Sequence, residues 1–237
     1  MLEHSLSTNT TSYSLFIRVH SEGFSLSVFD ESNSLLSARK VNTALFSLSM
    51  DDIISLFNDE TKLNYKNIGI VCESDSYTII PADIFNIENA ADFLHFEHKP
   101  VENESILFNK IPAFDIVNVF SIPTTIHKAL NFLFPDSSIE HHLSWFLKEK
   151  IKLQNENSLY IWTRVNMLDI LALKKGKLEL INSFNYQTTE DFVYFTLNIF
   201  DKLSLETETD PVFLFNSDNK PELRNLLSKY VTVSVIN

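Results

Sequence analysis

The stretch that decides the fold is Ser158 to Tyr186, SLYIWTRVNMLDILALKKGKLELINSFNY. It holds three runs rich in β-branched, aromatic and aliphatic residues, and each run has the length of a single strand. A turn at Asn166 separates the first two runs, and KKGK around Gly176 separates the second from the third. We therefore predict a β-meander, in which three consecutive strands are joined by tight turns.

A second meander is predicted near the N-terminus, between Tyr13 and Asn42. Its three runs are SLFIRVH, GFSLSVFD and SLLSARKV, with turns at residues 21–23 and 31–34. The chain therefore repeats one structural unit, and the repeat indicates two related halves.

A helix is predicted after each meander. Ser49 with Asp52, and Thr188 with Asp191, have the three-residue spacing of a capping box at the start of an apolar helical pattern. Further strands and helices follow in both halves. We predict an α/β (α+β) fold of two βββαβα-type halves, with mixed sheets flanked by helices.

The predicted domains are a disordered tail at residues 1–12, a first half at 13–157 and a second half at 158–237. Residues 13–95 and 158–237 are expected to superpose, and residues 96–157 to complete the first half with further strands and helices. One of the expected helices follows Pro81 and runs through ADIFNIENAADFLHFEH. Its candidate buried residues are Ile84, Phe85, Ile87, Ala91 and Leu94.

Several stretches resemble one uncharacterised bacterial family, domain of unknown function 3822. They are YTIIPADIFNIENAADFLHF, FDIVNVFSIPTTIHKALNFLFP and NSFNYQTTEDFVYFTLNIFDKLSLE, the last followed by a strand and ELRNLLSKYV. The resemblance covers nearly the whole chain after residue 12. It implies a duplicated actin-like ATPase fold, which is ribonuclease H-like, and it implies no known reaction and no established functional residues.

ATPases of that superfamily place an aspartate and glycines in the first turn of each meander, where backbone N–H groups surround phosphates and the carboxylate holds Mg²⁺. Here the first turn reads RVHSEGFSL and keeps only Gly23, while the second reads TRVNMLDIL and has no glycine. We therefore expect no nucleotide hydrolysis, no catalytic residues and no cofactor. The groups that a divergent ligand site in the cleft between the halves would use are His20, Ser21, Arg164 and Asn166.

The composition of the chain excludes some classes of partner. The net charge is −12, from 31 acidic and 19 basic residues, so we expect no nucleic-acid partner. No apolar run reaches the length of a membrane span, and the N-terminus has no secretory signal, so we expect a cytoplasmic protein without membrane contact. The one cysteine, Cys72, is expected to be buried and inert.

No metal site is predicted. His95 with His98, and His141 with His142, lack the i, i+4 spacing of helical metal ligands, so we interpret them as surface or loop histidines.

Two function classes remain after these exclusions. The first is a non-catalytic protein-interaction module that uses the groove between the halves or an exposed helix face to bind an unknown protein partner. The second is a divergent nucleotide or small-molecule binder that uses the cleft with the four residues named above. The partner, the pathway and the oligomeric state are not encoded in any motif of the sequence.

Overall fold

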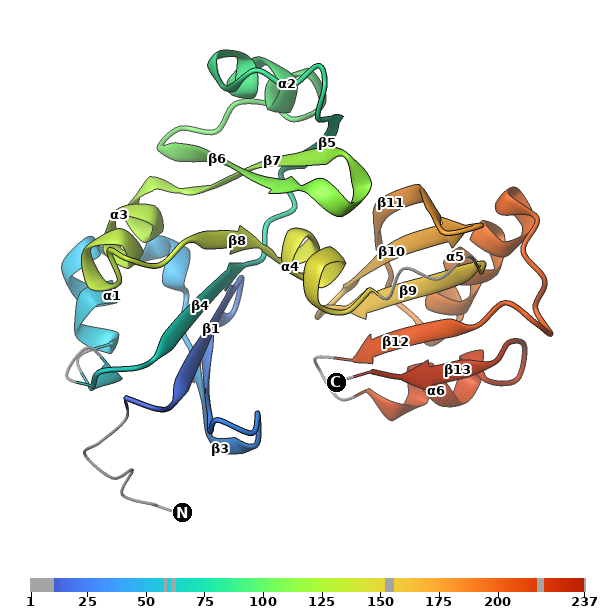
Figure 1. The fold of residues 1–237 in the computed structure, drawn as a ribbon, viewed down its shortest axis with the longest axis horizontal. Coiled ribbons are helices and arrows are strands. Elements are labelled where there is room, and N and C mark those ends of the chain that lie inside the picture. The colour runs from blue at the N-terminus through green and yellow to red at the C-terminus, as the bar shows by residue number, and fades with distance from the viewer. Residues whose placement is uncertain (1–10, 58, 61–62, 152–155, 217–219, 237) are drawn as a thin grey trace. The chain divides into compact units, whose positions relative to one another are not determined.

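Two compact units make up the chain, Met1–Trp145 and Phe146–Asn237, and the division falls inside helix α4 (His142–Glu149) (Figure 1). The computed structural model describes residues 11–57, 59–60, 63–151, 156–216 and 220–236. Each unit has its own five-stranded sheet. The predicted domains, residues 1–12, 13–157 and 158–237, stay a prediction.

The main sheet of the first unit has the strand order β3-β2-β1-β4-β8. β1 lies antiparallel to β2 and parallel to β4, β3 is antiparallel to β2, and β8 is parallel to β4. The strands are β1 (Ser14–His20), β2 (Gly23–Phe29), β3 (Leu35–Asn42), β4 (Asn67–Cys72) and β8 (Ile139–His141).

Buried and partly exposed residues alternate along β1, and the buried ones show which face of this sheet the helices cover. Leu15, Ile17 and Val19 are buried, and they share one core with residues of α1 (Met50–Leu56) and α3 (Thr124–Leu133). Side chains two positions apart point to the same face of a strand, so these three residues face the helices together. Short 3₁₀ helices η1 (Leu45–Ser47) and η4 (Pro112–Phe114) complete the connections of this unit.

The first unit also carries a smaller sheet in the connection between β4 and α3. It has the order β5-β7-β6, with all neighbours antiparallel. α2 packs on this sheet through a small core around Leu94, Ile80 and Val119. Its elements are β5 (Tyr77–Pro81), η3 (Ile87–Asn89), α2 (Ala90–Glu97), β6 (Glu104–Ile111) and β7 (Ile116–Pro123). In Figure 1 it is the green part of the chain.

The sheet of the second unit has the order β11-β10-β9-β12-β13. The meander predicted from Ser158 to Tyr186 forms its first three strands, and β12 and β13 add to it in parallel. The elements are β9 (Ser158–Thr163), β10 (Met167–Lys174), β11 (Lys177–Asn185), α5 (Thr189–Leu203), β12 (Val212–Asn216), α6 (Pro221–Leu227) and β13 (Val233–Val235).

The central strand β9 is buried along its whole length because both of its faces are covered. Leu159 and Ile161 join the core formed with α5 and α6. On the opposite face, Trp162 packs against Phe146 and Phe215, with ring centroids 5.4 and 4.8 Å away. A continuous apolar strand is the pattern expected of a sheet covered on both sides.

The two five-stranded sheets have the same strand order and the same strand directions, and this confirms the predicted duplicated fold. Both predicted capping boxes are also confirmed. The Ser49 hydroxyl accepts from the Asp52 N–H, and the Thr188 hydroxyl accepts from the Asp191 N–H. The expected superposition of residues 13–95 on 158–237 stays a prediction.

The helix predicted from Pro81 onward is wrong at its start. β5 ends at Pro81, a turn and η3 follow, and α2 begins only at Ala90. Ile84 and Ile87, predicted to be buried, are 58% and 62% exposed because they precede the helix. Leu94, which lies within the helix, is buried as predicted.

Candidate functional site

His20 and Ser21 lie at the turn between β1 and β2, and His20 is buried while Ser21 is exposed. Burial, and after it the positive charges of Arg18 and Lys40, lower the pKa of His20 to about 4. The imidazole is therefore neutral at neutral pH and contributes no positive charge for an anion. Arg18 is engaged as well, since its Nε donates to Glu73 Oε1 at 2.5 Å.

Gly23, next to this turn, has a structural reason to be glycine. Its φ is +136°, and a Cβ at this position would lie 2.0 Å from the carbonyl oxygen of Val41. The close passage of β3 therefore demands a residue without a side chain. This requirement exists without any ligand.

Arg164 and Asn166 lie together in the turn between β9 and β10. Arg164 donates through Nε and Nη2 to the two carboxylate oxygens of Asp169, at 2.8 and 2.9 Å. Asp169 is completely buried, and Ser183 Oγ donates to the same carboxylate at 2.5 Å. A buried bidentate pair of this kind holds the guanidinium in one orientation.

The rest of this turn is fixed by backbone contacts. The Tyr186 N–H donates to the Asn166 carbonyl at 3.0 Å, and Lys220 Nζ donates to the Val165 carbonyl and to the Tyr186 hydroxyl. The Asn166 residue itself is exposed. The structure thus places the four predicted cleft residues in two turns, with His20 and Ser21 in the first unit and Arg164 and Asn166 in the second.

Sequence reasoning missed Asp169 as the partner of Arg164. The signal was weak, because the two residues are five positions apart and lie on either side of a turn. The hairpin register brings them together, since Leu168 pairs with Thr163 and the Arg164 N–H donates to the Met167 carbonyl.

The interpretation of His141 and His142 as surface or loop histidines is wrong, because both are fully buried. The Leu143 N–H donates to His141 Nδ1, and His141 Nε2 lies 3.0 Å from the Ser74 carbonyl. His141 is therefore the neutral tautomer that carries its proton on Nε2. Asn118 Nδ2 also lies 2.9 Å from His141 Nδ1, so this histidine links β7, β8 and the segment after β4.

Neither a metal site nor a membrane span is found in the part of the chain that the structure describes. No group of three or more His, Cys, Asp or Glu residues there is arranged to hold a metal ion. No helix among the same residues is both long and apolar enough to cross a bilayer. Cys72 is buried, and burial together with the charge of Glu73 raises the pKa of its thiol to about 12.

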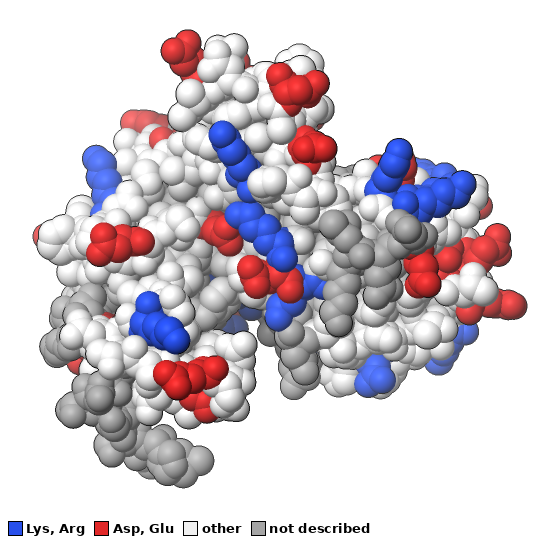
Figure 2. All heavy atoms as spheres, in the orientation of Figure 1, with Lys and Arg blue, Asp and Glu red and all other residues white. Residues whose placement is uncertain are grey.

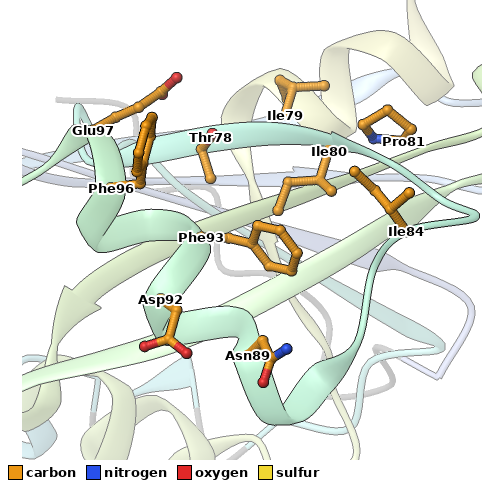
Figure 3. Close-up of a pocket in the computed structure, with 10 residues that line it drawn as sticks. All are labelled: Thr78, Ile79, Ile80, Pro81, Ile84, Asn89, Asp92, Phe93, Phe96 and Glu97. Carbon is orange, nitrogen blue, oxygen red and sulfur yellow. The ribbon is translucent and has the colours of Figure 1, made fainter.

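An open pocket of about 460 Å³ lies between α2 and β5. We call it the α2–β5 pocket. Phe93 points from α2 toward Ile80, and Ile84 lies beside them (Figure 3). The pocket is lined by Thr78, Ile79, Ile80, Pro81, Ile84, Asn89, Asp92, Phe93, Phe96 and Glu97.

Two apolar side chains that line this pocket are exposed. Phe96 is 90% exposed and Ile84 is 58% exposed. The sequence carried a signal for Phe96 that the helix prediction did not use. Leu94 and Phe96 are two positions apart and so point to nearly opposite sides of a helix, and the sheet that buries Leu94 cannot also bury Phe96.

Comparisons with known proteins agree with this architecture. A family model described as "Protein of unknown function (DUF3822)" matches residues 4–233. A search of curated proteins finds no match. A structure from Bacteroides thetaiotaomicron, described as a protein with actin-like ATPase fold and unknown function, is 28% identical, with a TM-score of 0.78 over 96% of this chain and 92% of the other.

A chain of the PilM–PilN type IV pilus biogenesis complex is also similar. It is 11% identical, with a TM-score of 0.54 over 94% of this chain and 88% of that chain. At this identity the likeness concerns the fold alone.

Proposed function

The chain belongs to the family of proteins of unknown function DUF3822, and on that premise we propose that it is a non-catalytic protein-interaction module built on an actin-like ATPase fold. It works in the cytoplasm, as predicted from the sequence. Its contact surface is the exposed face of α2 and the adjoining α2–β5 pocket.

The observation that carries this proposal is the exposure of Phe96 and Ile84, two large apolar side chains that line one open pocket. Single exposed apolar residues are ordinary, but a group of large apolar side chains beside a concave surface is typical of a site that binds another molecule. Burial of these side chains against a partner removes apolar area from water, which is the main source of association free energy.

The alternative, a divergent nucleotide or small-molecule binder, has less support. Phosphate binding without glycine-rich turns depends on cationic side chains. Arg164 is held by Asp169, and the lowered pKa of His20 leaves its ring neutral. These contacts favour a structural role for both turns.

Photocrosslinking at position 96 tests the proposal. A photoreactive phenylalanine analogue replaces Phe96 in the full chain, and irradiation in the native cell is expected to give discrete protein adducts. The matched control carries the analogue at Phe132, which is 67% exposed on α3. Equal adducts at both positions, or none at position 96, would contradict an interaction role for this surface.

A second measurement addresses the alternative function. We expect millimolar Mg-ATP to leave the melting temperature unchanged and to release no phosphate. A ligand at about 100 times its dissociation constant stabilises a protein by roughly 2.7 kcal/mol, so a genuine site would give a clear shift. A shift that Arg164→Ala abolishes, with His20→Gln as a second variant, would replace the module by the divergent binder.

A further inference from the structure

We infer that the α2–β5 pocket binds an amphipathic, basic helix of a partner protein, with the apolar side chains of that helix in the pocket and its Lys or Arg side chains toward Asp92 and Glu97. This inference rests on the proposed function and names the partner class. Three features support it: the apolar wall of the pocket, the hydrogen bonds already made at the outer edge of β5, and the negative charge around the pocket.

α2 offers the pocket apolar contact through Phe93 and Phe96. These residues are three positions apart and lie on the side of α2 that lines the pocket, together with Asp92, while Asn89 precedes the helix. Ile80 and Ile84 supply the opposite wall, as Figure 3 shows. An apolar groove beside a helix is a shape that accepts anchors at i, i+3, i+4 and i+7 of a partner helix.

The free edge of β5 argues against an added strand. β5 is at one end of the strand order β5-β7-β6. The Ser121 N–H of β7 donates to the Ser76 carbonyl, and the Ala82 N–H donates to the carbonyl of Asp115, the residue before β7. By the alternation of an antiparallel ladder, the main-chain groups of Tyr77, Ile79 and Pro81 are directed away from β7. A strand that added to this edge would have to pair with those three residues.

Two of the three carbonyl groups at this edge already have hydrogen-bond partners. His98 Nε2 lies 2.9 Å from the Tyr77 carbonyl, the Ile84 N–H donates to the Pro81 carbonyl at 3.3 Å, and proline has no N–H. An incoming strand would find continuous pairing only at Ile79. A helix satisfies its own backbone groups and needs only side-chain contacts, so this edge selects a helix over a strand.

The negative charge near the pocket indicates that the partner helix is basic. Residues 82–98 contain four acidic side chains, Asp83, Glu88, Asp92 and Glu97, and no Lys or Arg. Figure 2 shows acidic side chains on the surface over the α2 part of the molecule. A basic segment is attracted to this surface, whereas a second copy of the chain would bring the same carboxylates, and nucleic acid would bring phosphates.

The test uses a labelled synthetic peptide of about 14 residues with leucines at i, i+3, i+4 and i+7 and lysines elsewhere. A control peptide has the same composition with leucine and lysine alternating, which is the pattern of a strand. Fluorescence anisotropy with the full chain is expected to show at least tenfold tighter binding of the helical peptide. Equal or tighter binding of the alternating peptide would overturn the inference.

Matched variants locate the site. Phe96→Ala is expected to weaken binding of the helical peptide about thirtyfold, as truncation of an interface hot spot does, while Phe132→Ala changes it less than twofold. Glu97→Lys is expected to weaken binding several-fold more than Glu31→Lys, an exposed position outside the pocket. Both charge variants shift the net charge equally, so their difference reports the local carboxylate and not the overall charge of −12.

Three further outcomes overturn the inference: no binding of the helical peptide, equal effects of Phe96→Ala and Phe132→Ala, or self-association through this face that Phe96→Ala abolishes. The Mg-ATP melt is run on the same samples. If the helical peptide does not bind and Mg-ATP does not change the melting temperature, the basic-helix partner is excluded but the proposed interaction module is not. If Mg-ATP raises the melting temperature, the proposed function itself is contradicted.

Discussion

The two units repeat one sheet but differ in what connects its parallel strands. In the second unit the chain passes from β12 to α6 within a short connection. In the first unit the connection from β4 to α3 holds β5, α2, β6 and β7, a separate sheet with its own core. The same sheet forms in the second unit with a short connection, so the longer segment of the first unit is not required for the sheet. We therefore look for a function in that segment. The exposed apolar side chains of the α2–β5 pocket lie in that added segment.

The turns after the first strand also differ between the units, although both hold an arginine–carboxylate pair nearby. In the second unit Arg164 and Asp169 are buried, with side-chain exposures of 8% and 0%. In the first unit Arg18 and Glu73 have side-chain exposures of 17% and 7%. Arg18 can therefore reach water more easily than Arg164 when its partner is lost.

The largest expected effect comes from breaking the buried pair. We expect Asp169→Ala to reduce the free energy of unfolding of the second unit by about 3–5 kcal/mol, because it leaves a buried guanidinium without a counter-charge. Glu73→Ala should cost the first unit about 1.5–3 kcal/mol, the usual range for a hydrogen bond to a charged group.

Trp162 in the second unit and Trp145 in the first are the chain's two tryptophans, so each unit has its own fluorescent reporter in urea unfolding once the other is replaced by Phe. The double variant Arg164→Met, Asp169→Leu serves as the control and should lose less stability than Asp169→Ala alone. Equal losses for Asp169→Ala and Glu73→Ala would show that burial does not separate the two pairs.

A smaller effect is expected at the glycine that only the first unit has at its turn. Gly23→Ala should cost about 1–3 kcal/mol, the range for a strained backbone position, because the new Cβ meets the Val41 carbonyl. Gly69→Ala is the matched control, since its Cβ would lie 3.2 Å from a ring carbon of Phe16, a side chain that can move. If Gly23 existed only to admit a ligand, Gly23→Ala would leave the unfolding midpoint unchanged.

The two helix caps should respond alike, because both units use the same device after the meander. Ser49→Ala and Thr188→Ala are each expected to cost about 1 kcal/mol, the typical loss of an N-cap hydroxyl. Thr189→Ala, one position into α5, should change stability by less than about 0.5 kcal/mol. Urea unfolding with the reporter of each unit measures these losses, and a cap variant as stable as its parent would contradict the capping box.

Local patterns allowed much of the fold to be predicted. Alternating or continuous apolar runs, a few turn residues and two capping boxes identified both meanders and the helices that follow them. Each of these signals lies within a few residues of the chain. They do not say which sheet a strand joins, so the separate sheet of β5, β6 and β7 was not predicted as such.

The candidate site was less predictable, because its contacts are not local. The sequence suggested Arg164 as a group for a divergent ligand site, yet its ion pair with Asp169 depends on hairpin register. The burial of His141 depends on Ser74 and Asn118, which come from other parts of the chain. The exposure of Ile84 depends on where a helix begins, and Pro81 was equally compatible with the end of a strand.

A pH dependence is also expected, and it belongs to the first unit alone. Its first strand ends in His20, whereas the residue after β9 is Arg164. The folded-state pKa of His20, about 4, lies below its ordinary value of 6.5. The unfolded chain therefore binds a proton first as the pH falls, so the stability associated with neutral His20 is fully present above pH 6.5 and is lost progressively toward pH 4.

The variant His20→Gln removes this titration and keeps a neutral polar side chain. We follow the first unit through the fluorescence of Trp145. Between pH 7 and pH 5 we expect the unfolding midpoint of the natural chain to fall more than that of the variant. Carboxylates with a lowered pKa, such as Asp30 and Glu104, also contribute stability that is lost as the pH falls. They are present in both proteins, so their contribution cancels in the difference between the two midpoints. Parallel pH curves for the two proteins would show that His20 is protonated as easily in the folded chain as in the unfolded one. The same curves followed through Trp162 should remain parallel, because the second unit has no histidine at this turn, and this difference between reporters assigns the effect to the first unit.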